Sequence, residues 1–103
     1  GLRPMEMLLI GTGGCSSFDV VNILRKSRQQ VTDCQVDMQV TRADAVPAVF
    51  ESIHMHFIVT GKELSEKQVE RAVSLSAEKY CSASIMLAGA GVKMTHTFEI
   101  VEG

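Results

Sequence analysis

Two cysteines lie in short runs of small residues, Cys15 in GTGGCSS and Cys81 in CSAS. A thiolate that reacts with a peroxide becomes a sulfenic acid, and a second thiol nearby can condense with it to a disulfide. Such a pair requires α-carbons about 4.4–6.8 Å apart, a condition that positions in the sequence do not test. The two thiols are therefore compatible with redox chemistry, and each is also compatible with a small, inert core side chain.

The composition is that of one globular domain without a strong charge bias. The 103 residues are 46% hydrophobic and 21% charged, with a net charge of -2. No basic stripe is visible, so we expect no nucleic-acid partner. Charged residues interrupt every window near membrane-spanning length, so we expect no membrane partner. Three cysteines without a secretory signal argue against a disulfide framework and favour a reducing, cytoplasmic setting.

The stretch MEMLLIGTGGCSSFDVVNIL, residues 5–24, has two interpretations. A strand, a glycine loop and a helix would bind the phosphates of a dinucleotide, and Gly11 and Gly13 fit that pattern. Ser16 stands in place of the third glycine, however, and two adjacent strands follow instead of a parallel strand–helix alternation. The favoured alternative is one long helix over 4–28. Its thin, glycine-bearing side would let a backbone or a substrate approach Cys15.

The remaining periodicities predict an α+β fold with the order helix, strand, strand, helix, strand. Alternating apolar residues indicate strands at 34–41 and 49–61, which are close enough in sequence to pair antiparallel. A helix starts at Ser65, which is expected to form a capping box with Gln68. The small-residue segment 82–91 could fold back onto the first helix, and a last strand covers 92–101.

Two longer segments are more specific, PMEMLL…GGCSSFDVVNILRK and EKYCSASIMLAGAGVKMTHTFEI. Over essentially its whole length the chain resembles the OsmC/Ohr family of thiol-dependent peroxidases, and within it the YhfA-like branch. The resemblance implies one OsmC-like domain over residues 1–103, with a long central helix packed on an antiparallel sheet and an intertwined homodimer. Relative to the family, the strands that precede the central helix, with their arginine, are not present in this sequence.

By resemblance, Cys15 is the peroxidatic cysteine and Cys81 the resolving cysteine. Cys15 would attack the O–O bond of an organic hydroperoxide, Cys81 would form the disulfide, and a lipoyl or thioredoxin-like dithiol would reduce it, without a metal or cofactor. The family's glutamate lies ten residues before the first cysteine, where Met5 stands, so Glu6 is a candidate displaced by one residue. Asp19, one turn after Cys15, either orients a water or thiol or serves in helix packing or dimer contact.

Further residues leave alternatives open. His54 and His56 share one strand face and are a possible metal pair, although a solvated strand surface is the simpler interpretation. Cys34 and His96 lie on apolar strand faces and are interpreted as core residues. A different class of function also fits the sequence, namely a non-catalytic dimeric module that binds a small apolar ligand beside the first helix.

Overall fold

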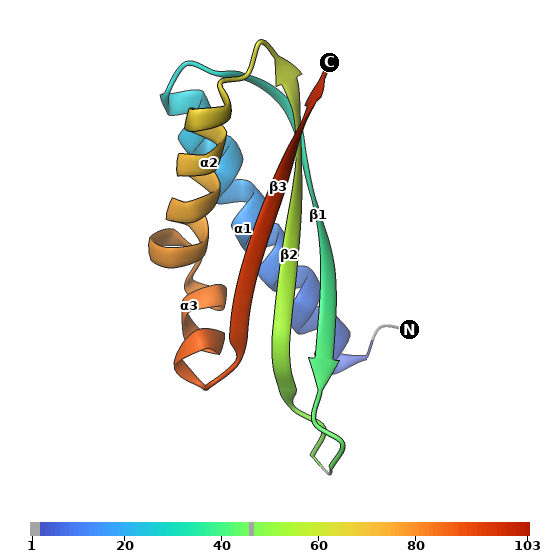
Figure 1. Ribbon diagram of the computed structural model, residues 1–103. Helices are drawn as coiled ribbons and strands as arrows, with labels where there is room; N and C mark the ends of the chain where they lie inside the picture. The colour runs from blue at the N-terminus through green and yellow to red at the C-terminus, as the bar shows by residue number, and fades with distance from the viewer. Residues whose placement is uncertain (1–2, 46) are drawn as a thin grey trace.

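The structure is a computed structural model that describes residues 3–45 and 47–103. Its three strands form one sheet, and the helices lie on one face of that sheet, so the molecule has two layers (Figure 1). The α+β class predicted from the sequence is confirmed. The elements are, in chain order, α1 (Pro4–Lys26), β1 (Gln30–Arg42), β2 (Phe50–Lys62), α2 (Glu66–Leu75), a π-helical turn η1 (Ser76–Tyr80), α3 (Ser82–Gly89) and β3 (Lys93–Glu102).

The sheet has the strand order β1-β2-β3 and contains both kinds of pairing. β1 and β2 form the expected antiparallel hairpin, in which Cys34 lies opposite Val59 and Met38 opposite Met55. β3 is parallel to β2, with His96 opposite Met55. The sheet is therefore mixed, and the expectation of antiparallel pairing is wrong for β3. The reason is the helical crossover after β2, which returns the chain to the end where β2 began.

Residues 5–24 belong to the single helix α1, so the dinucleotide-loop interpretation is wrong. Pro4 occupies the first turn of the helix. A backbone N–H at this position has no intrahelical acceptor, so proline, which lacks the N–H, loses no hydrogen bond there. Arg25 and Lys26 lie in the last turn, at the negative end of the helix dipole. The buried stripe of the helix recurs every fourth residue, at Thr12, Ser16, Val20 and Leu24.

By length and composition alone, α1 is also apolar enough to cross a membrane. An 18-residue window within it has a mean hydropathy of 1.4 and no more than two charged residues. The expectation that charges interrupt every such window is therefore wrong for this segment. In this fold α1 packs on β1, α2, η1 and α3, so that one side of it, with Val20 and Leu24, contributes to the core of the domain.

The start of α2 confirms half of the predicted capping box. The Ser65 side chain accepts a hydrogen bond from the N–H of Gln68 at 3.4 Å. The Ser65 N–H, however, donates to the side-chain Oε1 of Gln29 at 2.9 Å, and so Gln29 takes the part expected of the Gln68 side chain. Because Gln29 follows α1, this contact ties the beginning of α2 to the end of α1.

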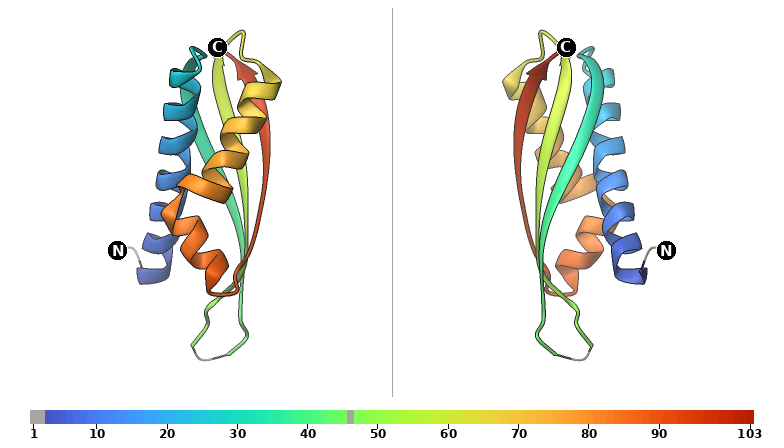
Figure 2. Two further views of the ribbon diagram at one scale, coloured as in Figure 1. Left: turned by 90° about the vertical axis from the view of Figure 1, so that its left-hand side faces the viewer. Right: turned by 90° about the vertical axis from the view of Figure 1, so that its right-hand side faces the viewer.

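The core lies between the sheet and the helices, and α2 and α3 from the second half of the chain cover it. α3 lies against α1 and beside η1, as the two views in Figure 2 show. The small-residue segment thus folds back onto α1 as expected, and this return brings residues 81–84 next to the middle of α1. The largest fully buried side chains of the core are Phe57, Leu24, Ile53, Met55, Val20 and Val59.

Candidate functional site

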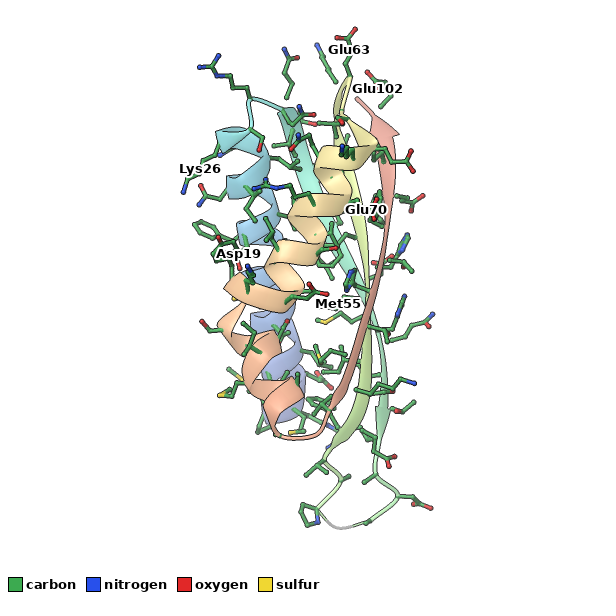
Figure 3. The ribbon with its side chains drawn as sticks, turned by 60° about the vertical axis from the view of Figure 1, so that its left-hand side comes forward. Asp19, Lys26, Met55, Glu63, Glu70 and Glu102 are labelled. Atoms are coloured by element: carbon green, nitrogen blue, oxygen red, sulfur yellow. The ribbon has the colours of Figure 1, made fainter. Side chains whose placement is uncertain are left out.

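Cys15 and Cys81 come together where α1 meets the start of α3. Their sulfur atoms and a carboxylate oxygen of Asp19 all lie within 4.8 Å of one another. We call these three residues the thiol cluster. All three cysteines of the chain are free thiols. Figure 3 shows Asp19 on α1, beside the helical segment that follows α2.

Local structure holds the Cys81 sulfur in position. The Cys81 N–H donates to the carbonyl of Ser76 at 2.8 Å, which ends η1. Cys81 is then the N-cap of α3, and its sulfur accepts hydrogen bonds from the N–H of Ser84 at 3.5 Å and from the Ser84 hydroxyl at 3.2 Å. Because a helix N-terminus carries partial positive charge, this position favours a negatively charged sulfur.

Three serines form a buried polar layer around the thiols, which the sequence analysis missed. Ser16, Ser76 and Ser84 are each at most 1% exposed. The hydroxyls of Ser16 and Ser84 lie 3.4 Å apart, and the Ser76 hydroxyl donates to the carbonyl of Ser16 at 3.0 Å. Ser16 also donates to the sulfur of Met55 at 3.7 Å, and Figure 3 shows Met55 between the helices and the sheet. The available signal was the serines beside both cysteines, in CSS and CSAS.

The two clustered thiols differ in how readily they ionise. Burial raises the pKa of Cys15, and a hydrogen bond with Cys81 raises it further, while the N–H of Ala83 acts in the opposite direction. Burial also acts to raise the pKa of Cys81, but hydrogen bonds from Ser16, Ser84 and Cys15 outweigh it, so that this pKa is lowered. Of the pair, Cys81 therefore loses its proton first, and the Cys15 thiol donates to the sulfur of Cys81.

Asp19 has a carboxylate that is only partly solvated. Its Oδ2 atom is buried and has no hydrogen-bond partner in the described part of the chain. The same burial raises the pKa of the Asp19 carboxyl group. Asp19 also lines an open cleft together with Lys26, Arg71 and Tyr80. A buried oxygen without a partner is costly unless it meets a proton or a cation, which makes Asp19 a candidate for function as well as for packing.

The glycines of α1 have unequal surroundings. A Cβ atom on Gly13 would lie 3.1 Å from the Cε atom of Met38, so Gly13 permits the close packing of α1 on β1. A Cβ atom on Gly14 would meet nothing within 4 Å. A shallow, mainly apolar groove beside it is lined by Leu9, Ile10, Gly13, Gly14, Ser17, Val36 and Met38.

Other candidate residues lie away from the thiol cluster. Glu6 is exposed in the first turn of α1, about 13 Å along the helix axis from Cys15. Cys34 is half-buried and packs against the core, as expected. His96 is half-buried on β3, between neighbours that include Met94 and Phe98 of the same strand face.

His54 and His56 are engaged on the open face of the sheet. The Nδ1 atom of His54 lies 2.6 Å from the hydroxyl of Thr95, and that of His56 lies 2.7 Å from the hydroxyl of Thr97. The Nε2 atom of His56 lies 3.2 Å from Glu99. Among residues 3–45 and 47–103, the potential metal ligands that gather in a group of three are those of the thiol cluster, whose ligand atoms lie within 4.8 Å of one another. Neither histidine belongs to such a group with other described residues.

The chain is similar to known proteins over nearly all of its length. A family model described as OsmC-like protein matches residues 1–97. Protein YhfA of Escherichia coli K12 is 53% identical over 98 residues, which are 95% of this chain and 72% of YhfA. A crystal structure of a hypothetical protein from Aquifex aeolicus is 36% identical with a TM-score of 0.92, covering 100% of this chain and 76% of that one.

A more distant structure shares the fold alone. The organic hydroperoxide resistance protein OhrB of Bacillus subtilis is 15% identical with a TM-score of 0.66, over 96% of this chain and 71% of OhrB. The residues that the family model matches, 1–97, include α1, β1, β2, α2, α3 and both clustered cysteines. The chain therefore belongs to the OsmC-like protein family.

Proposed function

We propose that this protein is a thiol-dependent peroxidase that reduces organic hydroperoxides, with Cys15 as the attacking thiol and Cys81 as the resolving thiol. The observation that carries the proposal is the meeting of two free sulfur atoms within 4.8 Å at the α1–α3 contact. Family membership supports the same chemistry, because OhrB, a distant relative with this fold, is described as an organic hydroperoxide resistance protein.

Each turnover would reduce one hydroperoxide by two electrons. Cys15 first passes its proton to the Cys81 thiolate, with which it shares a hydrogen bond. The resulting Cys15 thiolate attacks the outer peroxide oxygen, the O–O bond breaks, and the leaving alkoxide takes up a proton, which leaves a sulfenic acid on Cys15 and releases an alcohol. The Cys81 sulfur then attacks the Cys15 sulfur, and water leaves as the disulfide forms. A dithiol of the lipoyl or thioredoxin class reduces this disulfide and is itself oxidised. A cytoplasmic location belongs to the proposal, because such reductants work in reducing compartments.

Solvent exposure suits each thiol to its part. Cys15 is half-buried whereas Cys81 is fully buried, so a peroxide that arrives from solvent meets Cys15 first. Cys81 lies behind it, held by the Ser84 N–H and hydroxyl, within reach of the Cys15 sulfur. Of the amides at the start of α3, that of Ala83 acts on the Cys15 sulfur and opposes the rise of its pKa on burial, as a nearby cation does in many reactive cysteine sites.

The groove beside Gly14 favours a second function of another class. Its mainly apolar lining and its open glycine surface would fit a small apolar ligand next to α1. In this alternative the protein is a non-catalytic, homodimeric binding module that has the family's fold and no peroxidase activity. Gly14→Leu would fill the groove and should then weaken binding of a small apolar fluorescent dye.

Stopped-flow oxidation of the reduced protein by cumene hydroperoxide tests the peroxidase. Wild type and the matched control Cys34→Ser should react rapidly and give a Cys15–Cys81 disulfide in peptide mass mapping. Cys81→Ser should stop at a sulfenic acid on Cys15 that dimedone traps. Cys15→Ser should react at least about tenfold more slowly, because the attacking sulfur is gone. Slow oxidation spread evenly over the three cysteines would contradict the peroxidase and favour the binding module.

A further inference from the structure

We propose that the reduced thiol cluster binds a divalent metal ion of the zinc class, with the sulfur atoms of Cys15 and Cys81 and one carboxylate oxygen of Asp19 as ligands. The three atoms come from two positions one turn apart on α1 and from the N-cap of α3, and all lie within 4.8 Å of one another. This inference does not depend on peroxide reduction, since a protein can bind the ion whether or not it reacts with hydroperoxides.

The spacing is close to that of a tetrahedral site. Zinc–sulfur bonds of about 2.3 Å and zinc–oxygen bonds of about 2.1 Å place ligand atoms roughly 3.6–3.8 Å from one another at tetrahedral angles. Ligand atoms within 4.8 Å therefore need at most a small side-chain movement toward a common centre. Three protein ligands leave a fourth position for water, as in open zinc sites.

Asp19 supplies an independent observation. Its Oδ2 atom is buried, yet it has no hydrogen-bond partner among the described residues. Buried carboxylate oxygens are otherwise paired or coordinate metals, because the loss of hydration is not compensated when they stand alone. One carboxylate oxygen of Asp19 lies beside the two sulfur atoms, so a metal ion at the cluster would bind this carboxylate and give Asp19 a role that helix packing by itself does not explain.

The groups around the cluster are those that support thiolate ligands. The Ser84 N–H and hydroxyl point at the Cys81 sulfur, and the Ala83 N–H acts on the Cys15 sulfur. Such outer hydrogen bonds orient metal ligands and stabilise their charge. The Cys81 S–H group lies 3.8 Å from the carbonyl of Thr12, and the metal would replace this proton.

The ligand set also predicts which ions bind. Thiolates select soft or borderline ions such as Zn²⁺, whereas Mg²⁺ and Ca²⁺ prefer sites made of oxygen atoms. Two thiolates and one carboxylate carry a formal charge of about −3 when deprotonated, which outweighs the two positive charges of Lys26 and Arg71 in the neighbouring cleft. We therefore expect binding of Zn²⁺ and Co²⁺ and none of Mg²⁺.

Anaerobic titration of the reduced protein with Co²⁺ tests the site, because bound Co²⁺ reports sulfur ligands by charge-transfer absorption and four-coordination by its visible bands. We expect one ion per chain in wild type and in the controls Cys34→Ser and Asp37→Asn. Cys15→Ser, Cys81→Ser and Asp19→Asn should each weaken binding by at least about tenfold. Asp19→Asn with wild-type affinity, or loss of binding in Cys34→Ser, would overturn the three-ligand site.

A second measurement uses wild-type protein and so does not depend on how the variants fold. Zn²⁺ should slow alkylation of Cys15 by iodoacetamide at least about tenfold, leave Cys34 unaffected, and lose its effect when EDTA is added. Equal labelling of Cys15 with and without Zn²⁺ would overturn the proposal. Hydroperoxide oxidation of the metal-free protein is a separate assay, so failure of the peroxidase and failure of the metal site are distinguishable.

Discussion

The three cysteines have sulfur atoms in different surroundings. Those of Cys15 and Cys81 share a hydrogen bond and lie at the start of α3, whereas Cys34 packs against the core from β1. Burial, together with the charge of the neighbouring Asp33, raises the pKa of Cys34 to about 11. Because the thiolate is the nucleophile, Cys34 should be an unreactive core residue.

Iodoacetamide at pH 8 should therefore leave Cys34 largely unmodified in the folded protein. With a pKa of about 11, only about 0.1% of Cys34 is thiolate at pH 8, and its labelling rate should rise about tenfold per pH unit between pH 7 and 9. Timed labelling and peptide mass mapping measure these rates. Asp33→Asn should speed the reaction, since the carboxylate charge contributes to the raised pKa. Asp37→Asn, further along β1, is the matched control.

Labelling of the unfolded protein in urea is the reference for Cys34. If Cys34 in the folded protein were labelled at pH 8 as fast as in 8 M urea, the burial described for it would not exist in solution. The raised pKa of Cys34 also makes the free energy of unfolding depend on pH in a defined direction. A thiol whose pKa is raised on folding contributes stability below its unfolded pKa of about 8.5 and loses it as the pH rises toward 11.

At the scale of elements, one buried hydroxyl joins α1 to the π-helical turn η1. Ser76 is fully buried, and its hydroxyl donates to the carbonyl of Ser16 at 3.0 Å. Ser16 in turn contacts Ser84 of α3, so that the hydrogen bonds link three helical elements around the thiols. Because η1 immediately precedes Cys81, its attachment to α1 determines where that sulfur lies.

Ser76→Ala should destabilise the protein by about 1–2 kcal/mol, since a buried carbonyl loses a hydrogen-bond donor that water does not replace. Ser17→Ala is the matched control, because the exposed Ser17 hydroxyl donates to the carbonyl of Gly14 at 3.2 Å and should matter by less than about 0.5 kcal/mol. Urea unfolding followed by circular dichroism measures both free energies. Equal stability of the two variants would show that the Ser76 contact does not hold η1 on α1.

At the scale of the whole molecule, α1 has an apolar outer side. Figure 2 shows α1 along one edge of the helical layer, with a free outer surface. Large exposed side chains on it include Phe18 at 70%, Ile10 at 58% and Met7 at 58%. Exposed apolar clusters of this kind mark interaction surfaces in soluble proteins. We propose that a second copy of the chain covers them, in the homodimer that the family resemblance implies.

Phe18→Glu should therefore shift the protein from dimer toward monomer in analytical ultracentrifugation, with at least a tenfold weaker association, because a charge would be buried at the interface. Val49→Glu is the matched control, since Val49 is 53% exposed but belongs to the connection between β1 and β2 and not to α1. A wild-type chain that sediments as a monomer and unfolds cooperatively would refute the dimer. An unchanged dimer in Phe18→Glu would move the interface away from α1.

Local sequence patterns determined the elements of this protein. Alternating apolar residues predicted β1 and β2 as antiparallel neighbours, and Ser65 predicted the start of α2. These features depend on residues a few positions apart, for which backbone geometry dictates the direction of the side chains. The segments around Cys15 and Cys81 were also sufficient to indicate the OsmC-like family, to which the chain belongs.

Tertiary structure alone decided the site. Helix geometry alone places Asp19 one turn from Cys15, but the position at which α3 crosses α1 brings Cys81 to both of them and leaves Glu6 in solvent. The parallel direction of β3 and the Gln29 cap of α2 likewise depend on contacts between distant segments. Each helical residue turns a side chain by about 100°, which relates groups within one helix, whereas the packing of whole elements determines which sulfur atoms, hydroxyls and carboxylates of different elements meet.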